Sequence, residues 1–297
     1  QIAANAQKTG KMVVYFDSES AIDPMFLERA GCDLERLMYV QASSVEFVLE
    51  TIEELLGATD EQLVFIWDSL AFTPSISDVE GDFNPQSSMA VKARILAKGM
   101  SKLVIPIADK RATFIVLNQL KTNIPQGPMA RQIAMTTPYI TPGGKAMHYA
   151  YSLRIWLTGR KAKSAFIEDE KGFRIGSEVK VKLEKSRFGT QGRSCAFRIM
   201  WGTEDVGIRD EESWFDAIKG CEHLSSAGAW YTLSMPDGYT KKFQPSKWTS
   251  LVTSDEEFKN RVIQIMDEEI VQKFDKRQGD ASTYYEDPED ISVPIKE

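Results

Sequence analysis

The chain has 297 residues, 42% of them hydrophobic, which is enough for one large domain and a smaller one. Its three cysteines are widely spaced, form no CxxC pair and are accompanied by only two histidines. This pattern argues against a zinc site or a disulfide framework and predicts a reducing, cytoplasmic compartment. The apolar runs, such as Leu63 to Trp67, are far shorter than a bilayer span, so we expect no membrane partner.

The net charge of −7 is distributed unevenly along the chain. Residues 154–198 hold 12 Lys and Arg against 5 Asp and Glu, a net charge of +7, whereas residues 203–297 hold 11 against 21, a net charge of −10. The basic middle would attract a polyanion, and an acidic C-terminal stretch could compete with that polyanion for the same surface. The alternative is that both stretches are solvated faces, which is more common for a charge run taken alone.

Strands and helices alternate over the first two thirds of the chain. The apolar runs MVVYFD, LVFIWDS and TFIVLNQ predict strands that are covered on both faces. A helix between the first two is predicted to begin with a capping box of Ser43 and Glu46. Another helix follows the second run, with apolar residues from Met89 to Ile107 at spacings of three and four. This order predicts βαβ units around a mostly parallel sheet.

From Leu153 onward the pattern changes. LRIWLTG, SEVKVKLEKS and CAFRIMWG predict polar-alternating strands that extend the same sheet in antiparallel fashion. The acidic region after Gly202 contains a predicted hairpin of WYTLS and YTKKF and a helix capped by Ser254 and Glu257. We therefore expect an α/β core over 1–202, a small α+β domain over 203–276 and a disordered acidic tail over 277–297.

Polar side chains follow three successive predicted strands: Asp17-Ser18-Glu19, then Asp68-Ser69, then Asn118-Gln119. An acid and a serine after LVFIW have the form of a Walker B element, whose carboxylate holds Mg²⁺ beside nucleotide phosphates. Glu19 could then act as general base toward a water that attacks a γ-phosphate, and Gln119 could donate hydrogen bonds to that phosphate. Each residue alone could equally be a turn residue. Their joint placement favours a nucleotide site, because the carboxyl ends of parallel strands meet at one crevice.

Six segments occur in a characteristic order: FDSESAIDPMF, VFIWDSLAFTP, IVLNQLKT, GGKAMHYA, VKLEKSR and AGAWY. In this order they resemble the RecA-type strand-exchange recombinases, and the EKSR form is similar to the tailed-phage (UvsX-like) branch. The resemblance covers Gln1 to about Trp248. It implies a RecA-like ATPase core, whose mostly parallel central sheet is extended by antiparallel strands, followed by a small α+β C-terminal domain.

The resemblance implies ATP and Mg²⁺ as cofactors. Glu19 matches the carboxylate that polarises the attacking water, and Asp68 and Ser69 match the Walker B pair around Mg²⁺. Asp23 and Phe26 match the residues that contact adenine and stack on it.

Three further positions match residues that connect subunits and DNA. Gln119 matches the residue that touches the γ-phosphate and opens the second DNA-binding loop. Lys185 and Arg187 match two cations that reach the phosphates of the neighbouring subunit, although the second is lysine in many relatives.

Two stretches, Asp78 to Ser88 and Leu120 to Pro142, are rich in Gly, Pro, Ser and Thr and are too long for simple connections. By resemblance they line the filament axis and grip single-stranded DNA. Met89 matches a side chain that wedges between bases, although its spacing suits a core position equally well. The phosphate contacts expected by resemblance are Arg94 and the backbone amides of Gly143 and Gly144; to these we add Lys121 and Arg131, the cations of the second loop.

The sequence departs from the family at the Walker A loop. No GxxxxGK[ST] occurs, and Gly143-Gly144-Lys145 lies in the wrong part of the order and lacks the hydroxyl residue. QIAANAQKTGK resembles the end of the helix that follows this loop, so we expect the loop and the N-terminal segment to be missing through truncation, gene splitting or true loss.

The complete protein is expected to be an ATP-dependent recombinase in the bacterial or phage-infected cytoplasm. It would form a helical filament on single-stranded DNA and exchange that strand into a homologous duplex, while the 297 residues alone would be inactive. Two alternatives stay open: an ATPase-inactive DNA-binding paralogue or mediator, and a ring-forming helicase on the same fold.

Overall fold

The computed structural model describes residues 1–81, 90–124, 127, 135, 139–159, 165–202 and 206–271. The chain divides into two compact units, which are described separately. The first comprises Gln1–Tyr151 and Trp201–Gly207, and the second comprises Ser152–Met200 and the chain from Ile208 on. The division falls near Tyr151, earlier than the boundary at residue 202 expected from the change in composition.

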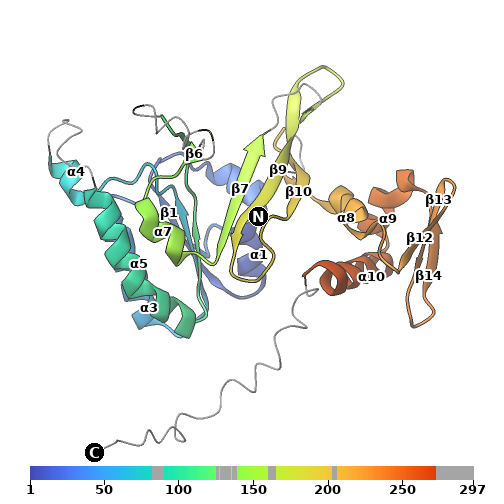
Figure 1. The fold of residues 1–297 in the computed structure, drawn as a ribbon, viewed down its shortest axis with the longest axis horizontal. Helices are drawn as coiled ribbons and strands as arrows, with labels where there is room; N and C mark the ends of the chain where they lie inside the picture. The colour runs from blue at the N-terminus through green and yellow to red at the C-terminus, as the bar shows by residue number, and fades with distance from the viewer. Residues whose placement is uncertain are drawn as a thin grey trace, which may run out of the picture. The chain divides into compact units, whose positions relative to one another are not determined.

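The first unit alternates helices and strands (Figure 1). Its elements are α1 (Ile2–Lys8), β1 (Met12–Asp17), α2 (Pro24–Arg29), β2 (Leu37–Gln41), α3 (Val45–Ala58), β3 (Leu63–Asp68), α4 (Ile76–Glu80), α5 (Val91–Asp109), β4 (Thr113–Val116), β5 (Lys121–Thr122), β6 (Tyr139–Ile140) and α7 (Gly144–Ala150). The first four strands form a parallel sheet in the order β2-β1-β3-β4, which confirms the predicted α/β class. The register pairs Asp17 with both Gln41 and Asp68, so β1, β2 and β3 end side by side.

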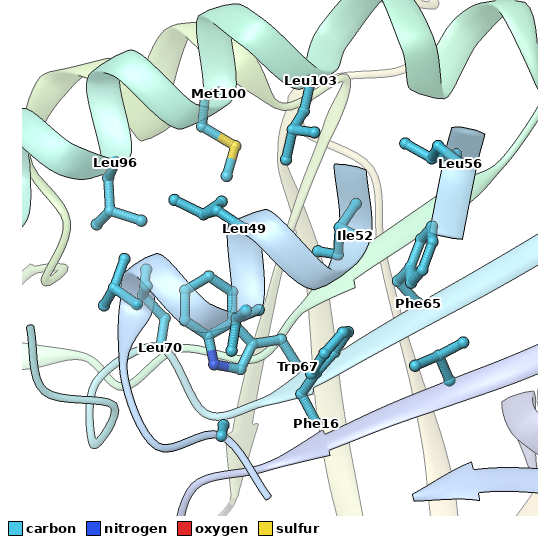
Figure 2. Close-up of a cluster of buried hydrophobic side chains, with 14 of the residues drawn as sticks. Phe16, Leu49, Ile52, Leu56, Phe65, Trp67, Leu70, Leu96, Met100 and Leu103 are labelled. Atoms are coloured by element: carbon cyan, nitrogen blue, oxygen red, sulfur yellow. The ribbon is translucent and has the colours of Figure 1, made fainter. Parts of the chain in front are cut away.

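One face of the parallel sheet packs against α3 and α5. Figure 2 shows strand side chains of β1 and β3 beneath α3, with α5 above them; the labelled residues are Phe16, Leu49, Ile52, Leu56, Phe65, Trp67, Leu70, Leu96, Met100 and Leu103. Phe16, Phe65 and Trp67 are fully buried. Each large apolar side chain buried in this way stabilises the fold by about 1.5–3 kcal/mol. The tight packing of β1 and β3 against these helices therefore fixes the position of their carboxyl ends.

The opposite face of the sheet packs against α1. Val13 of β1 and Val64 and Ile66 of β3 lie in one buried cluster with three alanines of α1. Because side chains alternate along a strand, Asp17 and Asp68 fall on this same side of the sheet.

Both predicted helix caps are displaced by one residue. Ser44, not Ser43, caps α3 with its hydroxyl, and the Glu46 carboxylate accepts a hydrogen bond from the backbone N–H of Ile76 instead of closing a capping box. In the second unit Asp255 caps α10 (Glu256–Met266). The hydroxyl of Ser254 is used elsewhere, since it donates to the carbonyl of Ser250. A competing backbone acceptor or a better placed neighbour decides the cap in each case.

The second unit contains antiparallel sheets and a small helical layer. Its elements are β7 (Leu153–Gly159), β8 (Phe166–Glu168), β9 (Arg174–Ser186), β10 (Ser194–Met200), β11 (Gly207–Arg209), α8 (Glu211–Ile218), β12 (Leu224–Ala227), β13 (Trp230–Ser234), β14 (Thr240–Phe243), a 3₁₀ turn (Pro245–Lys247), α9 (Trp248–Ser254), α10 (Glu256–Met266) and a π-helical turn (Asp267–Val271). Strand β11 begins at Gly207, the last residue of the first unit.

The antiparallel strands pair as predicted with one another, in the order β11-β10-β9-β7. They were expected to extend the parallel sheet; in the described residues they form a sheet of their own. The predicted hairpin is confirmed as β13 and β14, which form a three-stranded sheet with β12.

An aromatic cluster forms the core beneath this hairpin. Phe243 and Trp248 lie with ring centroids 5.6 Å apart, and Phe258 contacts both rings. The indole N–H of Trp248 donates to the carbonyl of Glu211, so its polar atom is satisfied inside the cluster. No helix in the part of the chain that the structure describes has the length and apolarity to cross a membrane.

Candidate functional site

Asp17 shapes the turn that follows β1. It is 2% exposed, and one carboxylate oxygen accepts hydrogen bonds from the backbone N–H groups of Glu19 and Ser20, both at 2.9 Å. The other oxygen accepts from the Tyr39 hydroxyl at 2.9 Å. These bonds occupy the carboxylate of Asp17, which makes it a support of the turn. Glu19 is the acid that this turn presents.

Hydrogen bonds join the ends of β1 and β3. The Ser69 hydroxyl donates to Oε1 of Glu19 at 2.8 Å. The hydroxyl of Ser18 accepts from the backbone N–H of Ser69 at 2.8 Å and lies within hydrogen-bond reach of the carbonyls of Ser69 and Asp68, at 2.9 and 3.1 Å. The structure therefore brings together Glu19, Asp68 and Ser69, three residues that the sequence predicted to share one site.

Tyr15 holds the carboxylate of Asp68. Its hydroxyl donates to Oδ2 of Asp68 at 2.7 Å. Burial, this hydrogen bond and the charges of Asp68, Asp17 and Glu19, in that order, raise the pKa of Tyr15, so it remains a donor at neutral pH. Tyr15 belongs to none of the motifs in the sequence. The signal was available, because strand alternation places Tyr15 on the same face as Asp17, two residues before it.

Asp68 and Ser69 fit the requirements of a magnesium site. Mg²⁺ is usually bound through one or two carboxylates and the phosphates of a substrate while it keeps several waters. Asp68 supplies a carboxylate, fixed through Oδ2 by Tyr15, and the next residue, Ser69, supplies a hydroxyl, which donates to Glu19. The described residues contain no group of three or more His, Cys, Asp or Glu side chains arranged to hold a metal by themselves.

Gln119 lies just beyond the end of β4. The backbones of β3 and β4 remain paired up to that point, because Leu117 donates its N–H to the carbonyl of Trp67 and accepts from the N–H of Leu70. Asn118 turns the chain by donating from its side chain to the carbonyl of Pro142 at 2.9 Å. Within the described residues, the Gln119 side chain makes no hydrogen bond to Glu19 or Asp68. The structure thus places it at the same sheet edge without joining it to them.

Asp23 and Phe26, the residues expected to contact adenine, lie at the start of α2. The Asp23 side chain accepts a hydrogen bond from the backbone N–H of Met25 at 2.9 Å and caps this helix. Phe26 is 40% exposed, so part of this aromatic residue is accessible to a ligand. Asp23 thus has a local structural role whether or not it also contacts a nucleotide.

Lys185 and Arg187 belong to the second unit. Lys185 lies near the end of β9, opposite Arg154 of β7, and Arg187 follows the strand with its backbone N–H donating to the carbonyl of Ser152. Burial and the neighbouring charge of Arg187 lower the pKa of Lys185. The two cations are thus close enough to repel each other.

Four of the six residues expected to contact DNA lie within the described ranges, whereas Met89 and Arg131 lie outside them. Arg94 is exposed in the first turns of α5, and Lys121 is exposed at the start of β5.

Gly143 and Gly144 begin α7 with φ angles of +103° and +73°. A Cβ atom at Gly143 would lie 3.1 Å from Leu70 Cδ2, and one at Gly144 would lie 3.1 Å from Ala93 Cβ. Glycine therefore permits both the backbone conformation and the close approach of α7 to α5.

Comparisons with known proteins identify the family. Residues 1–207 match the RecA N-terminal domain. Protein RecA of Colwellia psychrerythraea (strain 34H) is 28% identical over 234 residues, 78% of this chain and 62% of that protein. Protein RecA of Clostridium novyi (strain NT) is 30% identical over 233 residues, 78% of this chain and 61% of that protein. Protein RecA of Bifidobacterium breve is 28% identical over 266 residues, 88% of this chain and 62% of that protein.

The chain thus spans less than two thirds of the length of these curated relatives. The RecA N-terminal domain match takes in 207 of its 297 residues, including the ends of β1, β3 and β4. By this match the chain belongs to the RecA family.

Proposed function

We propose that the protein is an ATP-dependent DNA recombinase of the tailed-phage (UvsX-like) branch, which forms a filament on single-stranded DNA and exchanges that strand into a homologous duplex. The observation that carries this proposal is the hydrogen bond from Ser69, the residue that follows Asp68 at the end of β3, to Glu19 just after the end of β1. An acid that can accept a proton and an acid that can hold a metal meet at the carboxyl ends of adjacent parallel strands. This is the arrangement that nucleotide hydrolysis at such a crevice requires.

In this proposal each residue at the sheet edge has a separate task. Asp68, held by Tyr15, and Ser69 bind Mg²⁺, which when present neutralises charge on the phosphates. Glu19 orients the attacking water and accepts its proton, while the hydroxyl of Ser69 fixes one of the two carboxylate oxygens. The other oxygen of Glu19 is left to face the substrate.

Assembly of protomers completes the proposed site. Lys185 and Arg187 reach the phosphates bound by the next protomer and stabilise negative charge in the transition state. Gln119, at the end of β4, contacts the γ-phosphate and orders the stretch from Leu120 to Pro142 on DNA. ATP hydrolysis and DNA binding are therefore linked through a residue that is adjacent to both.

A second candidate is an ATPase-inactive paralogue that binds DNA or caps a recombinase filament. It is favoured by one observation, namely that the 297 residues contain no GxxxxGK[ST] phosphate-binding loop. Glu19 and Asp68 would then be inherited features without a triphosphate to act on.

The experiment that separates these functions uses the complete product of the native gene, with any coding sequence upstream of Gln1 included. ATP hydrolysis is measured with and without single-stranded DNA, and the complexes are imaged by electron microscopy. We expect hydrolysis that increases on adding DNA, together with helical filaments. Filament-bound protein without hydrolysis would establish the paralogue, and hydrolysis indifferent to DNA, or rings in place of filaments, would refute the recombinase.

A further inference from the structure

Lys92 is anchored in an unusual way for a lysine near a surface. It lies in the first turn of α5, and its ammonium group donates to the carbonyls of Leu70 and Thr73, both at 2.6 Å. The carbonyl of Ala71 lies 3.4 Å from the same nitrogen. All three acceptors belong to the turn that directly follows Asp68 and Ser69. An ammonium group has three donors and no acceptor, so this ring of carbonyls matches its chemistry.

The environment of Lys92 distinguishes it from a solvated surface cation. Burial lowers its pKa, Asp78 raises it and Lys121 lowers it further. Leu70 and Thr73, the residues whose carbonyls it binds most closely, are fully buried. Removing the ammonium would leave the carbonyl oxygens of these buried residues without this donor, which costs free energy of folding. Removing an exposed lysine has no such cost.

A chain of hydrogen bonds leads from this turn to Glu19. The hydroxyl of Thr73 donates to the carbonyl of Ser69 at 2.9 Å and accepts from the indole N–H of Trp67 at 2.8 Å. The hydroxyl of Ser69 in turn donates to Glu19. Lys92 therefore contacts the same turn that positions the hydrogen-bonding partner of Glu19.

The place of Lys92 in the chain gives this contact a functional meaning. Lys92 follows the stretch Asp78 to Ser88 by four residues, and Arg94, which we propose contacts DNA phosphate, lies two residues further along the same turn of α5. A change in the position of the α5 N-terminus would thus move the carbonyl-bound ammonium, and with it the turn that carries Ser69.

We propose that Lys92 is a positioning residue that transmits single-stranded DNA binding to Glu19 through the turn 70–73 and Ser69. The inference rests on the proposed recombinase function. It adds to that function a named physical link between DNA at the start of α5 and the proton acceptor at the end of β1.

The test compares Lys92→Met, Lys92→Arg and Lys98→Met in the complete gene product. Methionine keeps the apolar stem and removes the donors, whereas Lys98 is an exposed lysine of the same helix and serves as the matched control. We expect Lys92→Met to lower the DNA-stimulated kcat about tenfold with KM for ATP changed less than about twofold, because a misplaced catalytic group can cost up to about 10²-fold in rate. Lys92→Arg should recover most of the stimulation, and Lys98→Met should retain it.

Three outcomes would overturn the inference: full stimulation in Lys92→Met, equal losses in both Lys92 variants, or an effect confined to KM. Wild-type protein without DNA-stimulated hydrolysis would instead refute the recombinase function itself. If Lys92→Met fails to fold, hydrogen exchange on the wild type provides the second measurement. The amides of Leu70 and Thr73, which donate to Leu117 and Ser69, should exchange more slowly when DNA is added, and unchanged exchange would refute the link.

Discussion

Replacing Glu19 with glutamine isolates the proton-accepting role that we propose for this residue. The amide keeps an oxygen that can accept the hydrogen bond from Ser69, so the side chain should stay where the carboxylate lies. The turn should also persist, because Asp17 binds the backbone N–H of residue 19 and not its side chain. What the substitution removes is the ability to take a proton from water.

The expected loss follows from these contacts. A general base contributes about 10²–10⁴-fold to the rate, which corresponds to about 2.7–5.4 kcal/mol in the activation free energy. Since the supporting hydrogen bonds survive, the stability of the folded chain should change by less than about 0.5 kcal/mol, as for substitutions without a structural role. Glu19→Gln should therefore lower the rate of hydrolysis strongly and leave the free energy of unfolding almost unchanged.

The assay is single-turnover ATP hydrolysis by the complete gene product on single-stranded DNA, with ATP and DNA affinities measured alongside. We expect Glu19→Gln to bind both ligands normally and to hydrolyse at least about 10²-fold more slowly. Ser69→Ala is the companion variant, because it removes the bond that orients Glu19 but leaves the carboxylate. The hydroxyl of Ser69 is also proposed to bind Mg²⁺, so the loss in Ser69→Ala combines both roles. Normal turnover in Glu19→Gln would refute the assignment of Glu19 as the base.

Three further predictions concern other parts of the chain. Tyr15→Phe should reduce stability by about 1–3 kcal/mol in urea unfolding, because Oδ2 of Asp68 loses its donor; a loss below about 0.5 kcal/mol would contradict this account. Deleting 286–297 should strengthen single-stranded DNA binding most at low salt, and an unchanged salt slope would indicate a passive tail. The backbone N–H of Phe258 and the ammonium of Lys241 hold the pKa of Asp255 below its ordinary value of 3.8. The charged carboxylate therefore stabilises the fold above pH 3.8, and this stabilisation is lost as the pH falls through the lowered pKa. Asp255→Asn should therefore differ from wild type in thermal midpoint at neutral pH and converge with it in acid; a constant difference would refute the electrostatic origin.

The sequence predicted the parallel sheet because its signal is local and redundant. MVVYFD and LVFIWD are largely apolar up to their final aspartate, and both became strands with most side chains buried. The meeting of Glu19, Asp68 and Ser69 was also predictable, since it follows from the rule that parallel strands end at a common edge. Residue type and chain order were therefore enough to predict both the parallel sheet and the residues that meet at its edge.

Other features depend on contacts that no local pattern encodes. Ser43 and Ser44 are both plausible caps in sequence, and only the extended backbone of Ser44 places its hydroxyl on the N–H of Phe47. Lys92 appears in the sequence as one more charge on an amphipathic helix. Its role becomes visible only when the turn after β3 folds back to offer it three carbonyls.

The electrostatics of the two units give a physical reason why hydrolysis should depend on assembly. Glu19 and Asp68 place two carboxylates where a triphosphate would add more negative charge, so the sheet edge alone opposes binding. In the second unit the charges are positive: burial and, after it, the charge of Arg187 lower the pKa of Lys185 and so disfavour its charged form. A phosphate placed between the cation pair of one protomer and the carboxylates of the next, with Mg²⁺ on Asp68, would relieve both repulsions at once. On this reasoning Lys185→Met should weaken ATP-dependent filament formation and ATP hydrolysis together, and a loss of one without the other would show that the two repulsions are not relieved by the same phosphate.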